Sequence, residues 1–203
     1  MKWVRFLCAG AVFLALEAGA LGGAARSQAQ LKSGIYEGLT LAVDAQGAVT
    51  GSYQDEEGEG VTKSCSFFLA GHEKGGEAVV VTWSLETFPG SLKAADHGVI
   101  LQIENGRDHP GCASVLPPLI SEGMLLDLDS PADWTSLRRV IAKRAYLLRK
   151  PNDRRGGRAY LVNGDIVGVL ARSRDWLDVE YAKEGRRTRG WLRAADTAAI
   201  RPP

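Results

Sequence analysis

The sequence has few of the residue types that usually carry catalysis or hold metals. Its 203 residues include only three histidines and three cysteines. His72, His97 and His109 lack the short spacing of paired zinc ligands, such as H-x-x-x-H. No G-x-S-x-G segment supplies a serine nucleophile. The acidic run DEEGEG at residues 55–60 lacks the spacing of a calcium loop, and a solvated hairpin tip is the favoured interpretation. We therefore predict a non-enzymatic protein with no cofactor and no metal.

Long apolar runs are equally scarce, and the one that exists lies at the N-terminus. Lys2 and Arg5 precede an apolar stretch that extends to about Leu21. A transmembrane anchor is the competing interpretation, but this stretch is shorter than the roughly 20 residues that span a bilayer, and Glu17 interrupts it. Small residues before and at Ala29 are typical of a cleavage site. We predict a signal peptide at residues 1–29, no membrane insertion after its removal, and a periplasmic or secreted protein.

Removal of this segment, which carries Cys8, leaves Cys65 and Cys112. An even number of cysteines in an exported chain favours a disulfide. The alternative is a catalytic pair of Cys112 with His109 in the segment NGRDHPGC, residues 105–112. Pro110 and the glycines of that segment favour a tight turn instead. We predict that the turn directs Cys112 to Cys65, and that His109 is exposed or caps the turn.

Charge divides the remaining chain into two unlike halves. Residues 30–133 contain 5 basic and 16 acidic side chains, whereas residues 134–203 contain 17 basic and 7 acidic ones. We therefore expect two domains with this boundary. Each half could simply carry a solvating surface. Alternatively, the basic half faces an anionic partner such as a cell-wall polymer, phospholipid headgroups, an acidic protein or the acidic half itself. Export makes nucleic acid an unsuitable partner.

The acidic half shows the alternation and turn signals of antiparallel strands and no helical period. Strands are expected around residues 39–43, 49–53, 64–71, 77–85, 97–105 and 123–129, and residues 34–36 look like the start of the same meander. Six strands at hairpin spacing predict a small barrel or a curved antiparallel sheet. The G-x-Y rhythm around Tyr36 and Tyr53 resembles small exported barrels of the avidin or lipocalin kind. That resemblance concerns architecture and transfers no ligand-binding residue.

The basic half carries five short predicted strands, at residues 145–148, 159–162, 167–170, 176–181 and 190–192. Its order of motifs, from V-I-A at 140–142 through N-G-D at 163–165 to G-W-L at 190–192, resembles bacterial SH3-like domains (SH3b) over about 60 residues. The family's usual asparagine-arginine-glycine-proline segment is replaced by LRKPN at 148–152. The resemblance implies a small closed barrel that binds a cell-wall peptide or a protein and performs no chemistry itself.

The candidate binding residues are therefore the aromatic and arginine side chains of the basic half. Part of this aromatic area must form the core, and for Trp191 the core is favoured. The arginines before Trp191 are expected in a loop, where they could meet carboxylates or phosphates. The candidates are Tyr146, Trp176, Tyr181, Arg186, Arg187, Arg189 and Trp191.

Together these patterns predict an all-β protein in which a disulfide-closed antiparallel β-barrel or curved sheet precedes a small SH3-like barrel. The function that follows is an exported binding protein for a cell-wall component, peptide or glycan, or for a periplasmic protein. A periplasmic immunity protein or inhibitor of a secreted toxin or wall hydrolase is the alternative, because a rigid domain binds with little ordering cost. The sequence leaves the oligomeric state and the docking of the two halves open.

Overall fold

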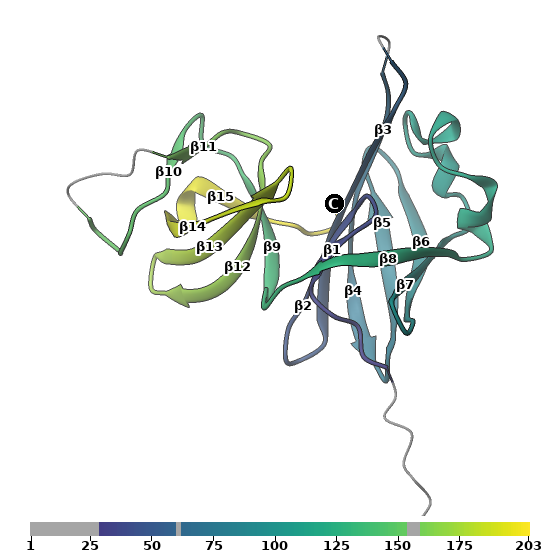
Figure 1. Cartoon of the computed structure of the whole chain (residues 1–203), viewed down its shortest axis with the longest axis horizontal. Coiled ribbons are helices and arrows are strands. Elements are labelled where there is room, and N and C mark those ends of the chain that lie inside the picture. The colour runs from purple at the N-terminus through teal and green to yellow at the C-terminus, as the bar shows by residue number, and fades with distance from the viewer. Residues whose placement is uncertain (1–28, 60–61, 154–158) are drawn as a thin grey trace, which may run out of the picture.

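The computed structural model describes residues 29–59, 62–153 and 159–203. In this part of the chain the structure consists of fifteen β-strands and four short 3-10 helices, without an α-helix (Figure 1). The predicted all-β class is therefore confirmed. The expected signal peptide lies outside the described residues except for Ala29. No helix in the described ranges has the length and apolarity needed to cross a membrane.

Eight strands form a closed antiparallel barrel in which each strand pairs with its neighbours in the chain and β1 pairs with β8. The strands are β1 (Gly34–Tyr36), β2 (Leu39–Val43), β3 (Ala48–Glu57), β4 (Lys63–Lys74), β5 (Glu77–Trp83), β6 (Thr87–Ala94), β7 (Gly98–Ile103) and β8 (Met124–Pro131). The predicted antiparallel barrel is confirmed, with eight strands instead of six. Strand β6 is not predicted from the sequence because it contains Pro89, and proline is unfavourable within a strand. The pairing of β6 with β7 begins only at Gly90, so Pro89 lies beyond that ladder, where its missing N–H is tolerated.

The barrel interior is filled by side chains that alternate along the strands. Leucine and aromatic residues dominate it, and all are at most 3% exposed. The largest contributors are Leu39, Leu41, Tyr53, Phe67, Leu69, Leu92, Leu101 and Ile103. The side chains that alternate with these on β2 to β5 face outward, and they can contact the C-terminal half of the chain.

Between β7 and β8 the chain forms three 3-10 helices, η1 (Gly106–Asp108), η2 (Cys112–Ser114) and η3 (Pro118–Ser121). Cys112 forms the predicted disulfide with Cys65 on β4, at a Cα–Cα distance of 4.4 Å. Gly111 precedes it with φ +81°, and a Cβ there would lie 2.1 Å from the Ser64 carbonyl oxygen. Only glycine permits this close approach, so the turn interpretation of this segment is correct.

The C-terminal half contains a five-stranded antiparallel sheet with the order β14-β13-β12-β9-β15 and a two-stranded sheet, β10-β11. The strands are β9 (Ser136–Val140), β10 (Ala145–Tyr146), β11 (Tyr160–Leu161), β12 (Ile166–Ser173), β13 (Trp176–Lys183), β14 (Arg186–Arg193) and β15 (Thr197–Ala199), with η4 (Ala194–Asp196) before β15. Strands β9 and β15 were not expected. The three arginines expected in a loop lie on β14, because β13 and β14 pair continuously from Trp176 to Lys183 and only two residues connect them. That loop prediction is wrong.

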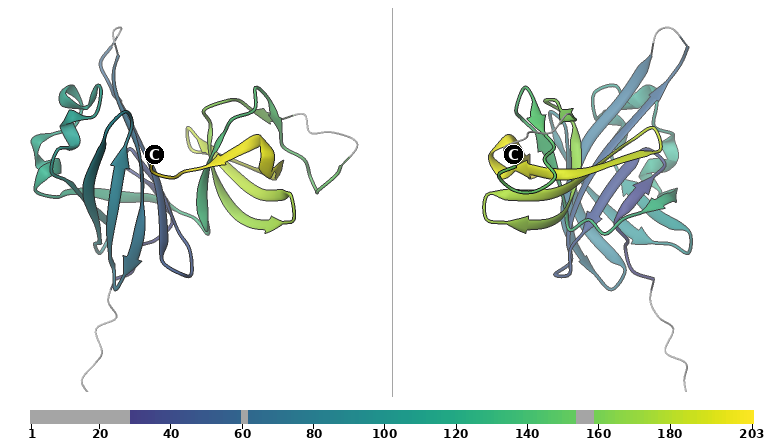
Figure 2. Two further views of the ribbon diagram at one scale, coloured as in Figure 1. Left: turned by 180° about the vertical axis from the view of Figure 1, so that it is seen from behind. Right: turned by 60° about the vertical axis from the view of Figure 1, so that its left-hand side comes forward.

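The two halves lie side by side (Figures 1 and 2), and they meet through an apolar contact. Trp134, Leu137 and Ile200 from the C-terminal half form one buried cluster with Ala42 and Trp83 on the outside of the barrel. At the border of this cluster the Leu137 N–H donates a hydrogen bond to the Thr50 Oγ1 at 2.8 Å. Among the described residues no ion pair crosses this contact. Burial of apolar surface, together with hydrogen bonds such as those from Arg187 to Ser130 and Pro131, therefore joins the halves.

Candidate functional site

His109, which the sequence suggested as exposed, is buried with 1% of its surface accessible. Its ring stacks on Phe67 with centroids 4.8 Å apart and meets Phe88 edge-on at 4.7 Å. Nε2 lies 3.0 Å from the Thr82 hydroxyl and Nδ1 lies 3.1 Å from the Ser84 hydroxyl. The expectation of exposure is wrong because the turn that brings Cys112 to β4 also carries its neighbour His109 inward.

The hydrogen bonds of His109 indicate that it has a structural role and does not act as a general base. The Thr82 hydroxyl donates its single proton to the Phe88 carbonyl oxygen, so Nε2–H donates to Thr82 and Nδ1 accepts from Ser84. In a catalytic triad a carboxylate holds the histidine and stabilises the imidazolium, whereas here the corresponding group is a neutral hydroxyl. Cys112 is in a disulfide, and the Ser114 hydroxyl donates to the Gly111 carbonyl oxygen. None of these groups supplies a nucleophile paired with a competent base.

Burial of His109 makes stability depend on pH. Desolvation lowers the pKa of His109, and the nearby charge of Asp108 opposes this only in part. The unfolded chain therefore binds a proton more readily than the folded one, so the free energy of unfolding is at its full value above about pH 6.5 and falls as the pH is lowered. Urea unfolding between pH 5 and 8 measures this slope. We expect His109→Gln to reduce it and the exposed control His97→Gln to leave it unchanged; equal slopes in all three proteins would contradict the assignment.

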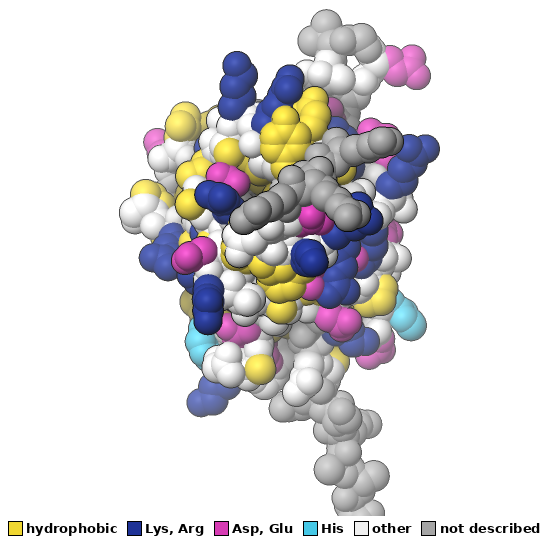
Figure 3. All heavy atoms as spheres, turned by 90° about the vertical axis from the view of Figure 1, so that its left-hand side faces the viewer, with side chains coloured by type: hydrophobic (Ala, Val, Ile, Leu, Met, Phe, Trp, Pro, Cys, Tyr) yellow, Lys and Arg dark blue, Asp and Glu magenta, His cyan; other side chains and the backbone are white. Residues whose placement is uncertain are grey.

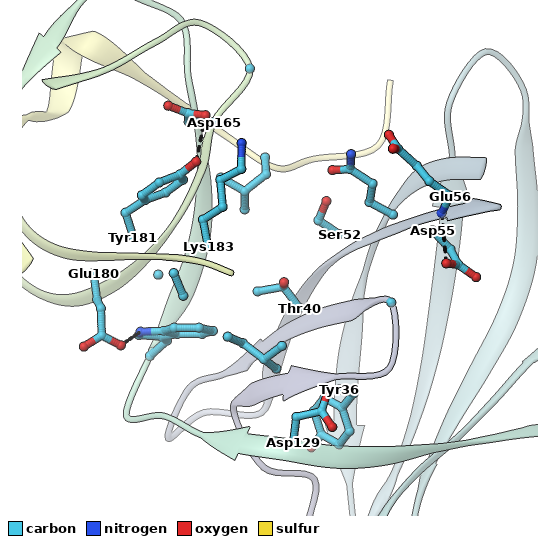
Figure 4. Close-up of a pocket in the computed structure, with 18 residues that line it drawn as sticks. Tyr36, Thr40, Ser52, Asp55, Glu56, Asp129, Asp165, Glu180, Tyr181 and Lys183 are labelled. Atoms are coloured by element: carbon cyan, nitrogen blue, oxygen red, sulfur yellow. Dashed lines mark hydrogen bonds between the residues drawn. The ribbon is translucent and has the colours of Figure 1, made fainter. Parts of the chain in front are cut away.

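A cleft of about 700 Å³ lies between the barrel and the C-terminal half and is a candidate binding site (Figure 4). On the barrel side, β2, β3 and the end of β8 supply Thr40, Ser52, Gln54, Asp55, Glu56 and Asp129. Thr40, Ser52, Gln54 and Asp129 face outward because their neighbours along each strand fill the barrel interior. Asp55 lies on the opposite face of β3 from Gln54 and Glu56, and its carboxylate accepts a hydrogen bond from the Tyr53 hydroxyl. On the other side, the segment before β9, the β11–β12 turn and β13 supply Trp134, Asp165, Glu180, Tyr181 and Lys183.

Trp134 and Arg187 fix the position of the C-terminal wall. The indole N–H of Trp134 donates to a carboxylate oxygen of Glu180 at 3.2 Å, and the Arg187 guanidinium donates to the same oxygen at 2.7 Å. The other end of Arg187 donates to the Ser130 hydroxyl at 2.6 Å and the Pro131 carbonyl at 2.9 Å, both at the end of β8. A Cβ on Gly168 would lie 2.3 Å from the indole ring, so glycine is required behind it. The wall is therefore held rigidly against the barrel.

Hydroxyl groups complete the cleft and remain protonated at neutral pH. The Tyr181 hydroxyl donates to Asp165 at 3.2 Å, and both burial and that carboxylate raise the pKa of Tyr181. Burial raises the pKa of Tyr36 to about 12, and its hydroxyl donates to the Lys32 carbonyl oxygen. Both tyrosines therefore contribute neutral, fixed side chains to the walls.

Acidic residues outnumber basic ones in the lining of the cleft. Five acidic residues line it, Asp55, Glu56, Asp129, Asp165 and Glu180, together with one lysine, Lys183. The Glu180 carboxylate is paired with Arg187, which offsets part of this negative charge. Figure 4 shows these groups on both walls. On the face seen in Figure 3, basic side chains are mixed with acidic and apolar ones. The cleft is therefore acidic although one of its walls belongs to the basic half.

The structure brings only two of the seven predicted binding residues to this cleft. Tyr181 lines it, and Arg187 holds its wall by contacts within the chain. Arg189 is paired with Asp178 through two hydrogen bonds of 3.0 and 2.5 Å, and Arg186 is exposed on β14. The set predicted from sequence is thus divided between the cleft, an interface between the halves, and the surface.

The remaining predicted aromatic residues lie elsewhere on the C-terminal half. Trp176 is 9% exposed at the start of β13 and packs under the guanidinium of Arg193, 5.5 Å from its ring centroid. Trp191 is partly buried, and its backbone pairs with Leu148. Tyr146 is 48% exposed beside Tyr160, with ring centroids 5.9 Å apart. These side chains do not converge on the cleft.

Sequence reasoning missed Trp134, Asp129 and Glu180 because nothing local distinguishes them from other strand-end residues. The acidic run that was weighed as a calcium site begins at the end of β3, where Asp55 and Glu56 join the cleft wall. Within the described residues no group of three or more histidine, cysteine, aspartate or glutamate side chains could hold a metal ion.

Comparison of the chain with models of protein families, with curated proteins and with solved structures finds no match.

Proposed function

We propose that this chain is an exported, non-enzymatic binding protein that recognises a periplasmic protein or a cell-wall component in the cleft between its two halves. The observation that carries this proposal is the cleft itself: about 700 Å³, with walls from both halves and a rigid Trp134–Glu180–Arg187 contact behind it. Binding sites occur preferentially at such junctions between domains. Preformed walls also reduce the entropy lost on binding.

Export to the periplasm of a Gram-negative bacterium agrees with the Cys65–Cys112 disulfide, since such bonds form and persist in oxidising compartments. The predicted signal peptide is the second argument for this location. The SH3-like assignment of the C-terminal half remains part of the proposal. It is supported by the five-stranded antiparallel sheet, with a core of its own around Val140, Leu177 and Leu192.

An immunity protein or inhibitor of a secreted toxin or wall hydrolase is the second candidate. It is favoured by the preformed shape of the cleft, because a rigid acidic surface can oppose the charge of a basic enzyme without reordering. In this case the cleft would hold a segment of the target enzyme, and a partner protein in equal amount would copurify with the chain.

Filling the cleft tests the proposal directly. Ser52 lies on the outward face of β3 within the cleft, and Ser91 lies on the outward face of β6 away from it. The tagged protein is crosslinked in its host cells and purified, and separately mixed with purified peptidoglycan. We expect Ser52→Trp to lose its partner or its retention on peptidoglycan by at least tenfold, as a steric block should, and Ser91→Trp to behave as the unchanged protein. Equal capture by all three proteins would overturn the proposal.

A further inference from the structure

Two carboxylates of the cleft have no partner within the described part of the chain. Asp55 accepts hydrogen bonds from the Glu56 N–H and the Tyr53 hydroxyl, Asp165 from Tyr181, and Glu180 from Trp134 and Arg187. Glu56 and Asp129, in contrast, make no side-chain hydrogen bond or ion pair among these residues. Both belong to the barrel wall. A ligand with hydrogen-bond donors and positive charge would therefore find two acceptors that are still free.

The chain itself shows which chemistry this wall accepts. The Arg187 guanidinium lies 5.5 Å from the centroid of the Trp134 ring and 2.7 Å from Glu180 at the border of the cleft. Its remaining hydrogen bonds go to oxygen atoms at the end of β8. A π-face, a carboxylate and carbonyl groups together form the environment that guanidinium and ammonium groups prefer.

The cleft also offers apolar surface between its charges. The half-buried side chains of Ile35 and Ile166 line the same space as Asp129 and Glu180. Lysine and arginine have long aliphatic stems that lie along apolar surface while their charged ends reach polar groups. An alternation of apolar and acidic groups on both walls therefore fits such side chains better than it fits a small inorganic cation.

We infer that the cleft binds an extended basic segment of a partner protein, with lysine or arginine side chains directed at Glu56 and Asp129. This inference rests on the proposed function and adds the class of ligand. It favours protein over cell wall, because peptidoglycan stem peptides carry carboxylates that a predominantly acidic lining repels. The same acidic lining attracts a basic partner.

The test uses the folded full-length mature protein and three probes: octalysine, octaglutamate and a soluble peptidoglycan fragment with its stem peptide. Binding is measured by calorimetry, and the site is located by amide chemical shifts of Thr40, Ser52, Asp129 and Gly164, all in the cleft. We expect octalysine to shift these amides and octaglutamate not to. Binding of octalysine should weaken as sodium chloride is raised from about 50 to 300 mM, because exposed charges are screened.

The double variant Glu56→Gln and Asp129→Asn removes two charges with little change of shape. The matched control, Glu104→Gln with Glu122→Gln, removes two exposed charges that do not line the cleft. We expect the cleft variant to bind octalysine about tenfold more weakly, in line with two partly solvated ion pairs, and the control to bind within about twofold of the unchanged protein.

The possible results separate this inference from the proposed function. Equal octalysine affinity for the cleft variant and the control, or octalysine shifts confined to other residues, would overturn the basic-segment assignment. Shifts of the cleft amides with the peptidoglycan fragment alone would also overturn it, while leaving the cleft as a binding site. If the native partner is captured unchanged by Ser52→Trp, the proposed function itself fails.

Discussion

Replacement of Trp134 with alanine is expected to lower the free energy of unfolding by about 3–5 kcal/mol, the range for large aromatic side chains in a core. Trp134 is 2% exposed and is the centre of the cluster between the halves. The substitution leaves a cavity beside Gly168 and removes the indole hydrogen bond to Glu180. Because the same side chain positions a cleft wall, the variant should also lose ligand binding. Urea unfolding followed by circular dichroism measures the loss of stability.

Two comparisons show whether this loss arises from the contact between the halves. Trp134→Phe keeps most of the apolar area and loses only the indole N–H, so we expect a smaller cost of about 1–2 kcal/mol. Tyr160→Ala removes an aromatic side chain that is 45% exposed and should cost under about 1 kcal/mol. A loss below about 1 kcal/mol for Trp134→Ala would show that the halves do not depend on this contact.

Loss of the disulfide is expected to have an effect of similar size. The pair Cys65→Ala and Cys112→Ala opens a loop with a sequence separation of 47 residues. Chain-entropy arguments assign about 4 kcal/mol to a loop of this length, and removal of native disulfides from small domains costs about 2–5 kcal/mol. The segment that carries η1 to η3 would then be held on the barrel by packing of Leu116, Ile120 and His109 and by hydrogen bonds such as those of His109 to Thr82 and Ser84. We expect this segment to exchange its amide hydrogens earlier than the strands.

Reductant provides the control for the disulfide. Both sulfurs are fully buried, so the unchanged protein must be reduced in urea and refolded under dithiothreitol before the comparison. It should then unfold at the midpoint of the alanine variant, and dithiothreitol should leave the variant unaffected. A variant as stable as the oxidised protein would mean that the bond adds nothing to the stability of the barrel.

Both effects concern the rigidity of the cleft walls. The disulfide secures one end of β4 and Trp134 secures the C-terminal half against the outside of β2 to β5. A cleft between loosely tethered halves would have to be ordered on binding, at a cost in entropy. Apolar docking of the two halves removes that cost in advance.

Much of the barrel could be predicted from local patterns. Alternation around Leu39–Val43 and Glu77–Trp83 marks strands with one buried face, and the turn after the first of them is marked by Gly47, which has positive φ. Strand β6 was missed because of Pro89, and β9 and β15 because each is short and carries arginine or small residues. Their strand conformation depends on ladders to partners that are distant in the sequence.

The sequence by itself predicted the all-β class, the antiparallel strands and the Cys65–Cys112 bond, because strand periodicity, turn residues and the number of cysteines are local or countable properties. Only the tertiary structure decided that the strands close into a barrel and not a curved sheet, that His109 is buried, and that Arg187 joins the halves beside a cleft lined by acidic residues. A period of two residues shows which side chains share a face of a strand. It does not show what covers that face, and here the covering element begins at Trp134, more than 80 residues beyond the β2 and β3 positions that it meets.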